Sequence, residues 1–295
     1  MGGTGRHTRG RMRNSFGKGV RPSDCADSMA ARVLEITTVQ TAPFRTLATA
    51  LKDILLETNI IFTEEGIRIM NMDKSQTMLV HLLLDAENFE TFNCVHPKIT
   101  IGVNTLHFFR LINTMDNDDT LTLFINADDY SDGVVDHLGL KFENGNIGQC
   151  KTHKLKLIEP DPEESTMPEV EFSSVISLPA SDFQKIVRDM ATISDRIAVQ
   201  SVGKELIFSC KGSYAEATIR RSEMEDGSTT FKDNDGHVVH GEFSLKNLSY
   251  FIKCTNLCPS IEMMLENDLP LVVMYNVASL GTIRLCLTPL PPKED

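Results

Sequence analysis

The sequence predicts an α+β fold built twice: two similar domains, each with antiparallel sheets and two helices. Three observations lead to this prediction. A helical pattern of apolar residues recurs at a constant offset of 139 residues, β-branched or alternating runs follow it in both halves, and an acidic segment containing prolines separates the halves. A duplication of this kind also suggests a pseudo-symmetric assembly.

The four expected helices form two equivalent pairs. Residues 44–54 (FRTLATALKDI) and 183–193 (FQKIVRDMATI) carry apolar side chains at helical spacing in the same register. Residues 104–115 and 244–255 form the second pair, and each begins with a suitable N-cap residue, Asn104 or Ser244. We therefore expect two helices in each half.

Strand signals surround these helices. Alternating or β-branched runs bounded by turn residues lie at 31–39, 59–65, 66–73, 77–85, 196–202, 217–223, 269–278 and 281–289. Residues 158–172 contain three prolines and five glutamates, which excludes a central strand and indicates an extended connector. The expected organisation is a first domain at 31–157, the connector at 158–172 and a second domain at 173–295.

Composition bounds the class of protein. Residues 1–30 are rich in Gly and Arg and predict a disordered basic tail, either an import or DNA-contacting arm or a solvated extension. This tail has six Lys or Arg against two Asp, a net +4, so the chain's total of −12 leaves −16 for the remainder. Seven cysteines without CxxC spacing favour neither disulfides nor a zinc site, and no signal peptide or membrane-spanning run is expected.

Cations recur on the polar sides of all four expected helices. Each one alone is an ordinary residue of a helix surface. Their repetition on four equivalent helices of an acidic chain instead predicts one positive face, suited to phosphates and not to base edges. We therefore expect salt-sensitive, sequence-independent binding of double-stranded DNA by seven residues: Arg45, Lys52, Arg110, Lys185, Arg188, Lys246 and Lys253.

Seven collinear stretches resemble the proliferating cell nuclear antigen family, the eukaryotic sliding clamps. The stretches are ALKDIL (50–55), NMDKSQTMLV (71–80), IGVNTL (101–106), FQKIVRDM (183–190), LSYFIKCT (248–255), LPLVVMYNVASLG (269–281) and LTP (287–289). The resemblance covers about residues 32–292. It implies a homotrimeric ring of six domains that encircles duplex DNA as a processivity factor, with the seven cations lining the pore.

The resemblance also implies how the ring closes. Residues 150–158 of one chain would pair with residues 213–221 of a neighbour, and the contact would include His153, Leu155, Tyr214, Thr218 and Arg220. Both segments alternate and carry basic side chains, a pattern that protection of an exposed edge strand also produces. The sequence alone leaves these two interpretations open.

A partner pocket follows from the same resemblance. Short peptides of DNA polymerase, the clamp loader ATPase, flap endonuclease and DNA ligase would bind it, although Met72 could instead be a core residue. Gln76, Cys286 and the pair Ser165–Thr166 depart from the family's usual His, Tyr and Leu-Gly, so partner preference is expected to differ. The implied lining is Met72, Gln76, Thr77, Met167, Pro168, Leu269, Pro270, Cys286, Leu287, Thr288 and Pro289.

No catalytic, cofactor or metal motif is expected. The acidic runs at 116–119 and 128–133 are interpreted as solvated turns, and neither GxSxG nor a phosphate-binding glycine loop occurs. Two alternatives remain, a subunit of a heterotrimeric checkpoint clamp and a monomeric viral processivity factor. The expected location is the nucleus or a viral replication compartment, and the long basic tail favours a viral or protist source.

Overall fold

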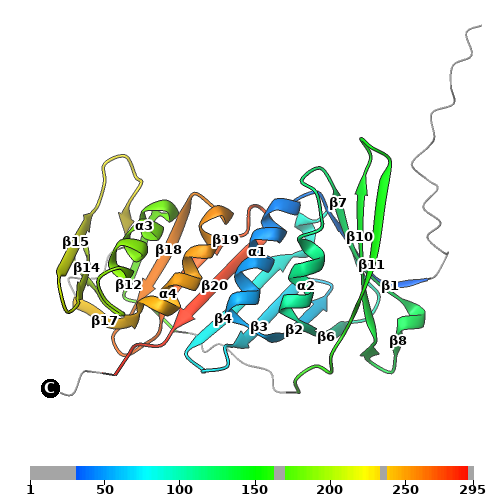
Figure 1. Cartoon of the computed structure of the whole chain (residues 1–295), viewed down its shortest axis with the longest axis horizontal. Coiled ribbons are helices and arrows are strands. Elements are labelled where there is room, and N and C mark those ends of the chain that lie inside the picture. The colour runs from blue at the N-terminus through cyan, green and yellow to red at the C-terminus, as the bar shows by residue number, and fades with distance from the viewer. Residues whose placement is uncertain (1–30, 163–169, 233–237, 292–295) are drawn as a thin grey trace, which may run out of the picture.

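The computed structural model describes residues 31–162, 170–232 and 238–291. The expected basic tail and residues 163–169 of the connector, including Met167 and Pro168, lie outside the described residues. In the described part the elements follow one order twice, a strand and a helix, then strands, then a second helix and more strands (Figure 1).

The first half contains two α-helices among eleven strands. Two short 3-10 helices, at Ala86–Asn88 and Ala127–Asp129, interrupt the strand succession. The elements are β1 (Arg32–Thr38), α1 (Thr41–Ile54), β2 (Glu57–Thr63), β3 (Gly66–Met72), β4 (Met78–Asp85), β5 (Thr91–Cys94), β6 (Lys98–Asn104), α2 (Thr105–Ile112), β7 (Thr120–Asn126), β8 (Tyr130–Ser131), β9 (Val134–Val135), β10 (His137–Asn144) and β11 (Gln149–Lys156).

The second half repeats this order with two further helices. Its last helix is shorter than the expected 244–255, because the chain tightens into a 3-10 helix, η3, after about two turns. The elements are β12 (Ser174–Pro179), α3 (Ala180–Ala191), β13 (Arg196–Val202), β14 (Glu205–Lys211), β15 (Glu216–Ser222), β16 (Thr230–Phe231), β17 (Val238–Ser244), α4 (Leu245–Phe251), η3 (Ile252–Leu257), β18 (Ser260–Leu265), β19 (Leu271–Asn276) and β20 (Gly281–Leu287).

Both predicted N-caps are made. The Asn104 side chain accepts a hydrogen bond from the His107 N–H at 3.1 Å, and the Ser244 hydroxyl accepts one from the Asn247 N–H at 3.3 Å. These bonds satisfy N–H groups that have no partner within the first turn of a helix. The start of each half's second helix is therefore fixed by a local interaction that the sequence encodes.

A single antiparallel sheet of nine strands joins the two halves. Its order is β16-β12-β18-β19-β20-β4-β3-β2-β6, and β20 pairs with β4 from Gly281 opposite Leu84 to Leu287 opposite Met78. A five-stranded sheet, β11-β10-β7-β1-β5, completes the first half, and a four-stranded sheet, β15-β14-β13-β17, completes the second. The halves are thus joined by a backbone ladder as well as by the connector.

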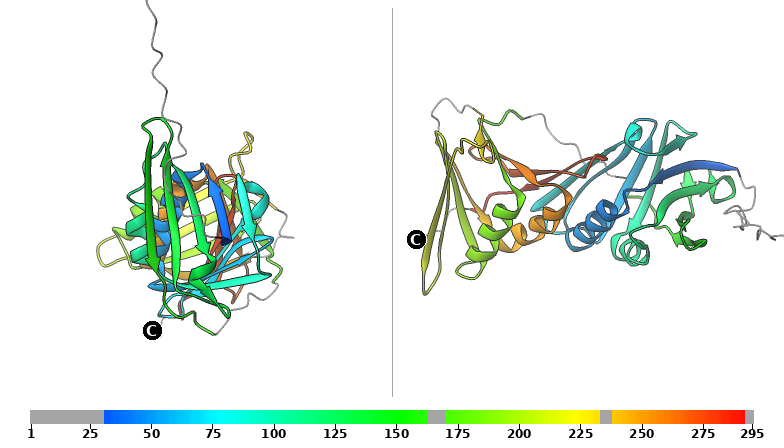
Figure 2. Two further views of the ribbon diagram at one scale, coloured as in Figure 1. Left: turned by 90° about the vertical axis from the view of Figure 1, so that its right-hand side faces the viewer. Right: turned by 90° about the horizontal axis from the view of Figure 1, so that it is seen from above.

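The four helices lie side by side on one face of the molecule, in the order α3, α4, α1, α2 (Figures 1 and 2). Each places its apolar side chains against the sheets behind it. In α1 the buried set includes Phe44, Leu47 and Leu51, and in α3 it includes Phe183 and Ile186. The opposite side of each helix is left to polar residues, as its amphipathic spacing predicts.

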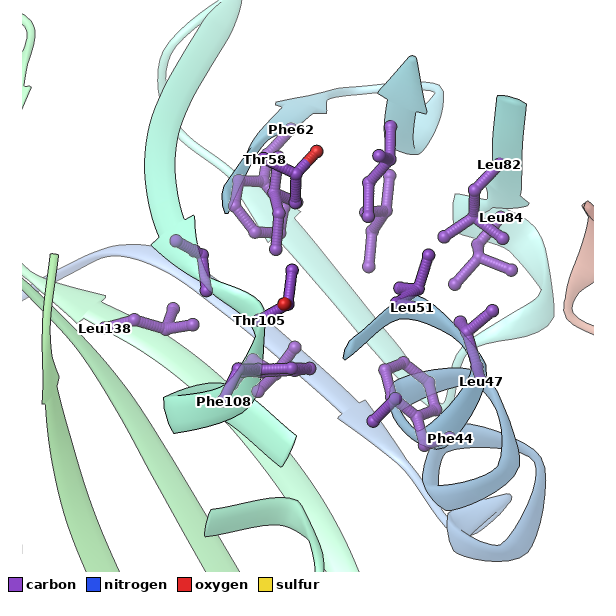
Figure 3. Close-up of a pocket in the computed structure, with 16 residues that line it drawn as sticks. Phe44, Leu47, Leu51, Thr58, Phe62, Leu82, Leu84, Thr105, Phe108 and Leu138 are labelled. Carbon is purple, nitrogen blue, oxygen red and sulfur yellow. The ribbon is translucent and has the colours of Figure 1, made fainter. Parts of the chain in front are cut away.

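The core of the first half encloses a small apolar cavity of about 40 Å³ (Figure 3). Phe44, Leu47 and Leu51 point into it from α1, Phe108 from α2 and Phe62 from β2. A space of this size with apolar walls offers a water molecule too few hydrogen-bond partners. We therefore assign the cavity to imperfect packing between the helices and the sheet and not to a ligand.

Removal of the Phe183 ring is expected to test the packing of α3. Phe183 is 1% exposed, so Phe183→Ala should lower the free energy of unfolding by about 3–5 kcal/mol through lost burial and a new cavity. Urea denaturation followed by circular dichroism measures this change. Ser181→Ala, at an exposed position of the same helix, is the control, with an expected change within about 0.5 kcal/mol.

Candidate nucleic-acid and partner interfaces

Four of the seven predicted cations project freely from the helix face. Arg110 on α2, Lys185 and Arg188 on α3, and Lys246 on α4 are all exposed. Over the described ranges, none of the four has a hydrogen bond or an ion pair. Their charges are therefore available to a ligand that lies across the helices.

The other three cations are held by the protein itself. Arg45 on α1 donates one hydrogen bond to the Asn117 side chain at 2.7 Å and a second to the Met115 carbonyl oxygen. Lys52 and Lys253 both contact the carboxylate of Asp53, and the Lys52 ammonium lies 4.8 Å from the centroid of the Phe109 ring. Arg45 is thus held by neutral acceptors, whereas the charges of Lys52 and Lys253 are partly neutralised by Asp53.

Asp53 forms an ion pair across the two halves of the chain. It belongs to α1, Lys52 is its neighbour in sequence at 2.8 Å, and Lys253 reaches it from η3 in the second half. Burial alone would raise the pKa of Asp53, but the hydrogen bonds and charges of Lys253 and Lys52 outweigh it and lower the pKa. Asp53 therefore remains ionised at neutral pH and holds the ammonium groups of both lysines.

The two segments expected to meet between chains are edge strands. β11 pairs only with β10, and β15 pairs only with β14, so each leaves one side of its backbone without a strand partner in the described structure. They lie at opposite ends of the long axis (Figure 1). An unpaired edge is a template for a strand from another chain.

The side chains at these edges differ in how accessible they are. Thr218 and Arg220 on β15 are exposed, and Arg220 lies 3.2 Å from Glu205 on the neighbouring strand. Tyr214 is 72% exposed in the turn before β15, where its hydroxyl donates to the Thr192 carbonyl oxygen. β15 begins at Glu216, so residues 213–215 of the expected strand are in this turn.

Two predicted contact residues on β11 face the protein's own interior. Leu155 is 6% exposed and belongs to the core, and the His153 ring packs 5.4 Å from the Phe142 ring. The reason is the alternation of strand side chains, which turns every second residue of β11 towards α2 and the core. At these two positions only the backbone lies on the open edge.

An apolar groove of about 140 Å³ crosses the face of the nine-stranded sheet where the halves meet. Its floor comes from β3, β4, β20 and β19, whose residues Met72, Leu79, Cys286 and Val272 are aligned in one cross-strand row. Six predicted residues line it: Met72, Thr77, Leu269, Pro270, Cys286 and Thr288. Leu79, Val170, Phe172 and Val272 also line it and were not predicted.

Three predicted pocket residues do not line the groove. Leu287 is 1% exposed and lies in the core, because it follows Cys286 directly and neighbouring strand residues point to opposite faces of a sheet. Gln76 is exposed at the tip of the β3–β4 turn, and Pro289 lies beyond the lining. Alternation along β4 and β19 could have identified Leu79 and Val272 in advance.

Asp73 shapes the turn beside the groove. Its carboxylate accepts hydrogen bonds from the N–H groups of Thr77 at 2.8 Å and Met78 at 2.6 Å, and from Ser75. Burial raises the pKa of Asp73, but these hydrogen bonds lower it by more, so the net shift is downward. The turn also fixes the position of Thr77, whose carbonyl oxygen accepts a hydrogen bond from the Thr288 N–H at 3.0 Å.

Comparison with known proteins decides the family. Residues 33–164 match the N-terminal domain of proliferating cell nuclear antigen, and residues 166–290 match its C-terminal domain. The chain belongs to the proliferating cell nuclear antigen family. It is also 29% identical over 263 residues to "Probable DNA polymerase sliding clamp 1" of Paramecium bursaria Chlorella virus 1, an alignment that covers 88% of this chain and 97% of the viral protein.

Membership of the proliferating cell nuclear antigen family gives the function. The protein is a DNA sliding clamp, a processivity factor that binds DNA and replication proteins. Clamps of this family are not enzymes, and the expectations of the clamp fold and of a non-catalytic role are confirmed. None of the helices in the described part of the chain is long and apolar enough to cross a membrane.

Release of Lys52 and Lys253 is expected to strengthen DNA binding by this clamp. Asp53→Asn removes the carboxylate that holds both lysines but keeps a side chain of similar size. The logarithm of the DNA association constant falls linearly with the logarithm of the salt concentration, and each additional phosphate contact makes this slope steeper by about 0.9. We expect the variant to bind duplex DNA more tightly at low salt, with a slope steeper by about 1–2, measured by fluorescence anisotropy from 50 to 200 mM salt.

The matched control is Asp189→Asn, an exposed acid on α3 with no ion pair in the described structure. Both variants remove one negative charge from the helix face, but only Asp53→Asn releases two lysines. Equal slopes for the two variants would show that the ion pair at Asp53 does not restrain the lysines.

Proposed function

We propose that three copies of this chain close head to tail into a ring around duplex DNA. The observation that carries the proposal is the position of the two edge strands, β11 and β15, at opposite ends of a molecule whose helices share one face. Two different surfaces that meet head to tail generate a closed ring when the rotation permits it. In such a ring the helix face would form the inner wall, and the nine-stranded sheet would form the outer one.

The charges support this orientation. The net charge of the chain is −12, yet four cations extend from one face and have no acidic partner in the described structure. They are Arg110, Lys185, Arg188 and Lys246. Side chains of this kind attract a phosphate backbone electrostatically without reading the base sequence, and such binding permits sliding. The enclosed duplex would then be retained by topology, while the cations keep it centred and allow sliding.

Two measurements test the ring. Light scattering of the full chain should give a mass about three times 32.9 kDa, and retention should be far longer on closed circular DNA than on linear DNA, from which a ring can slide off. A mass near that of one chain, or equal retention on the two DNAs, would contradict the proposal. A single-chain mass with charge-dependent retention would instead favour the monomeric processivity factor.

Charge reversal on α3 tests the inner wall. Lys185→Glu should reduce the salt slope of DNA binding by about 1 or more and weaken stimulation of a polymerase, and Lys185→Glu with Arg188→Glu should do so further. The control for DNA binding is Lys98→Glu on β6, at the sheet face opposite the helices. The oligomer mass should not change, because the loss is assigned to contact with DNA. If Lys98→Glu and Lys185→Glu reduce the salt slope of DNA binding equally, DNA does not bind at the helix face.

We further propose that the groove binds short client peptides that present an aliphatic and two aromatic anchors, from DNA polymerase, clamp loader, flap endonuclease and ligase, in the nucleus or a viral replication compartment. Leu79 lies in the middle of the groove floor, between Met72 and Cys286. Leu79→Ser should therefore weaken binding of such a peptide by about tenfold, or about 1.4 kcal/mol. Isothermal titration calorimetry measures the loss.

Leu83→Ser provides the control for the groove. Leu83 lies on the same strand and the same face as Leu79, two cross-strand rows away and outside the groove lining. For a peptide that carries only the apolar anchors and so does not extend past the groove, its replacement should leave the Kd within twofold of the unchanged protein. Equal losses for the two variants would indicate a general effect on β4 and not a peptide contact.

A further inference from the structure

The outer face of the nine-stranded sheet carries two arginines and a histidine beside the groove. Side chains on this face form cross-strand rows, and the row next to the groove floor pairs Met70 with His81 and His81 with Arg284. The following row places Arg68 opposite Leu83. We name Arg68, His81 and Arg284 the outer cationic trio.

The trio is compact and lies close to the groove. Side chains directly opposite on antiparallel strands have Cβ atoms about 4.5–5.5 Å apart, and diagonal neighbours such as Arg68 and His81 are about 7–8 Å apart. Burial lowers the pKa of His81, and the charges of Arg284 and Arg68 lower it further. Arg284 also acts on Cys286 in the groove floor: burial raises the pKa of that thiol to about 11, and Arg284 partly opposes this rise.

No carboxylate of the described structure forms an ion pair with the trio. The Nε of Arg284 and the Nδ1 of His81 are buried without a hydrogen-bond partner among the described residues. The acidic residue nearest to Arg284 along the row is Glu262, two strands away, or about 10 Å between backbones. Near Arg68, Glu65 and Asp85 share a hollow with Lys98. The lysines at Asp53, in contrast, have a carboxylate within contact distance.

Two arginines and a histidine without an acidic partner in the described structure suit an incoming anion. A buried donor without a partner is unfavourable, and a carboxylate accepts charge-assisted hydrogen bonds from guanidinium groups and a hydrogen bond from the N–H of a neutral imidazole. A hollow of about 330 Å³ continues from the trio along the sheet, and its charged lining consists of Arg68 and Lys98 together with Glu65 and Asp85. A peptide that leaves the groove in this direction therefore has space, and the positive charges that it meets first are those of Arg284 and Arg68.

We propose that the outer cationic trio binds an aspartate or glutamate of the client peptide whose apolar anchors occupy the groove. This inference rests on the peptide-binding role of the groove proposed above, and it adds a charge requirement for the segment outside it. Rows on one face of a sheet are about 6.7 Å apart, so the trio lies about 7–13 Å from the groove floor. An extended peptide covers this distance in two to four residues.

The test compares two fluorescent peptides on the full chain. Both carry the apolar anchors, but one has two glutamates two to four residues beyond the anchors and the other has glutamines there. The glutamate peptide should bind at least fivefold more tightly at 50 mM salt, and this advantage should shrink as salt increases. Equal affinity of the two peptides for the unchanged protein would overturn the inference while leaving the groove proposal intact.

Variants then assign the advantage to the trio. In Arg284→Gln, and in Arg68→Gln, the ratio of the two Kd values should fall below twofold, while the glutamine peptide should bind as it does to the unchanged protein. Lys204→Gln removes one exposed cation in the β13–β14 turn and should leave the ratio at fivefold or more. A ratio that survives in both arginine variants would overturn the assignment.

The two proposals fail in distinguishable ways. If neither peptide binds the unchanged protein, and Leu79→Ser gives the same binding signal as the unchanged protein, the groove is not a peptide site. The inference about the trio is then overturned as well. Thermal unfolding of each arginine variant establishes that its fold is retained. If the glutamate peptide keeps its tighter binding in Arg284→Lys, positive charge is the cause. If the preference for the glutamate peptide is lost in Arg284→Lys as well as in Arg284→Gln, the bidentate geometry of arginine is required.

Discussion

The pairing of β4 with β20 is the interaction on which the remaining structure depends. Seven register pairs along these strands turn two duplicated halves into one continuous sheet. Because a sheet has two faces, this single joint puts all four helices on one side and the groove on the other. The floor of the groove is continuous because Leu79 of the first half lies directly opposite Cys286 of the second.

Charge differs between these two faces. On the helix face, four of the seven cations have no partner among the described residues and three are restrained, two of them by Asp53, which also links α1 to the second half. In the proposed ring these cations would attract DNA while still allowing it to slide. On the sheet face, the unpartnered arginines are few and are placed next to an apolar groove, an arrangement that suits recognition of a short segment.

Much of the fold could be predicted from local sequence patterns. The two helix pairs, their N-caps at Asn104 and Ser244 and most strands follow from periodicity, because amphipathic spacing reports which face of an element is buried. The groove was predicted in part. The prediction that Leu287 lines it is wrong, because strand alternation places that residue in the core. Phe172 could not be predicted, because its position depends on how the connector passes over the sheet.

The sequence by itself determined the duplication, the elements, the set of cations on the helix surfaces and the resemblance to the sliding clamps. Only the tertiary structure decided which cations are free, which edge strands are open, and that Arg68, His81 and Arg284 are neighbours. The physical reason is the separation along the sequence of the residues that interact. Periodicity and capping act within a few residues. Ion pairs such as Lys253 with Asp53, and the cross-strand rows, join positions some 200 residues apart, and the proximity of these positions depends on strand register.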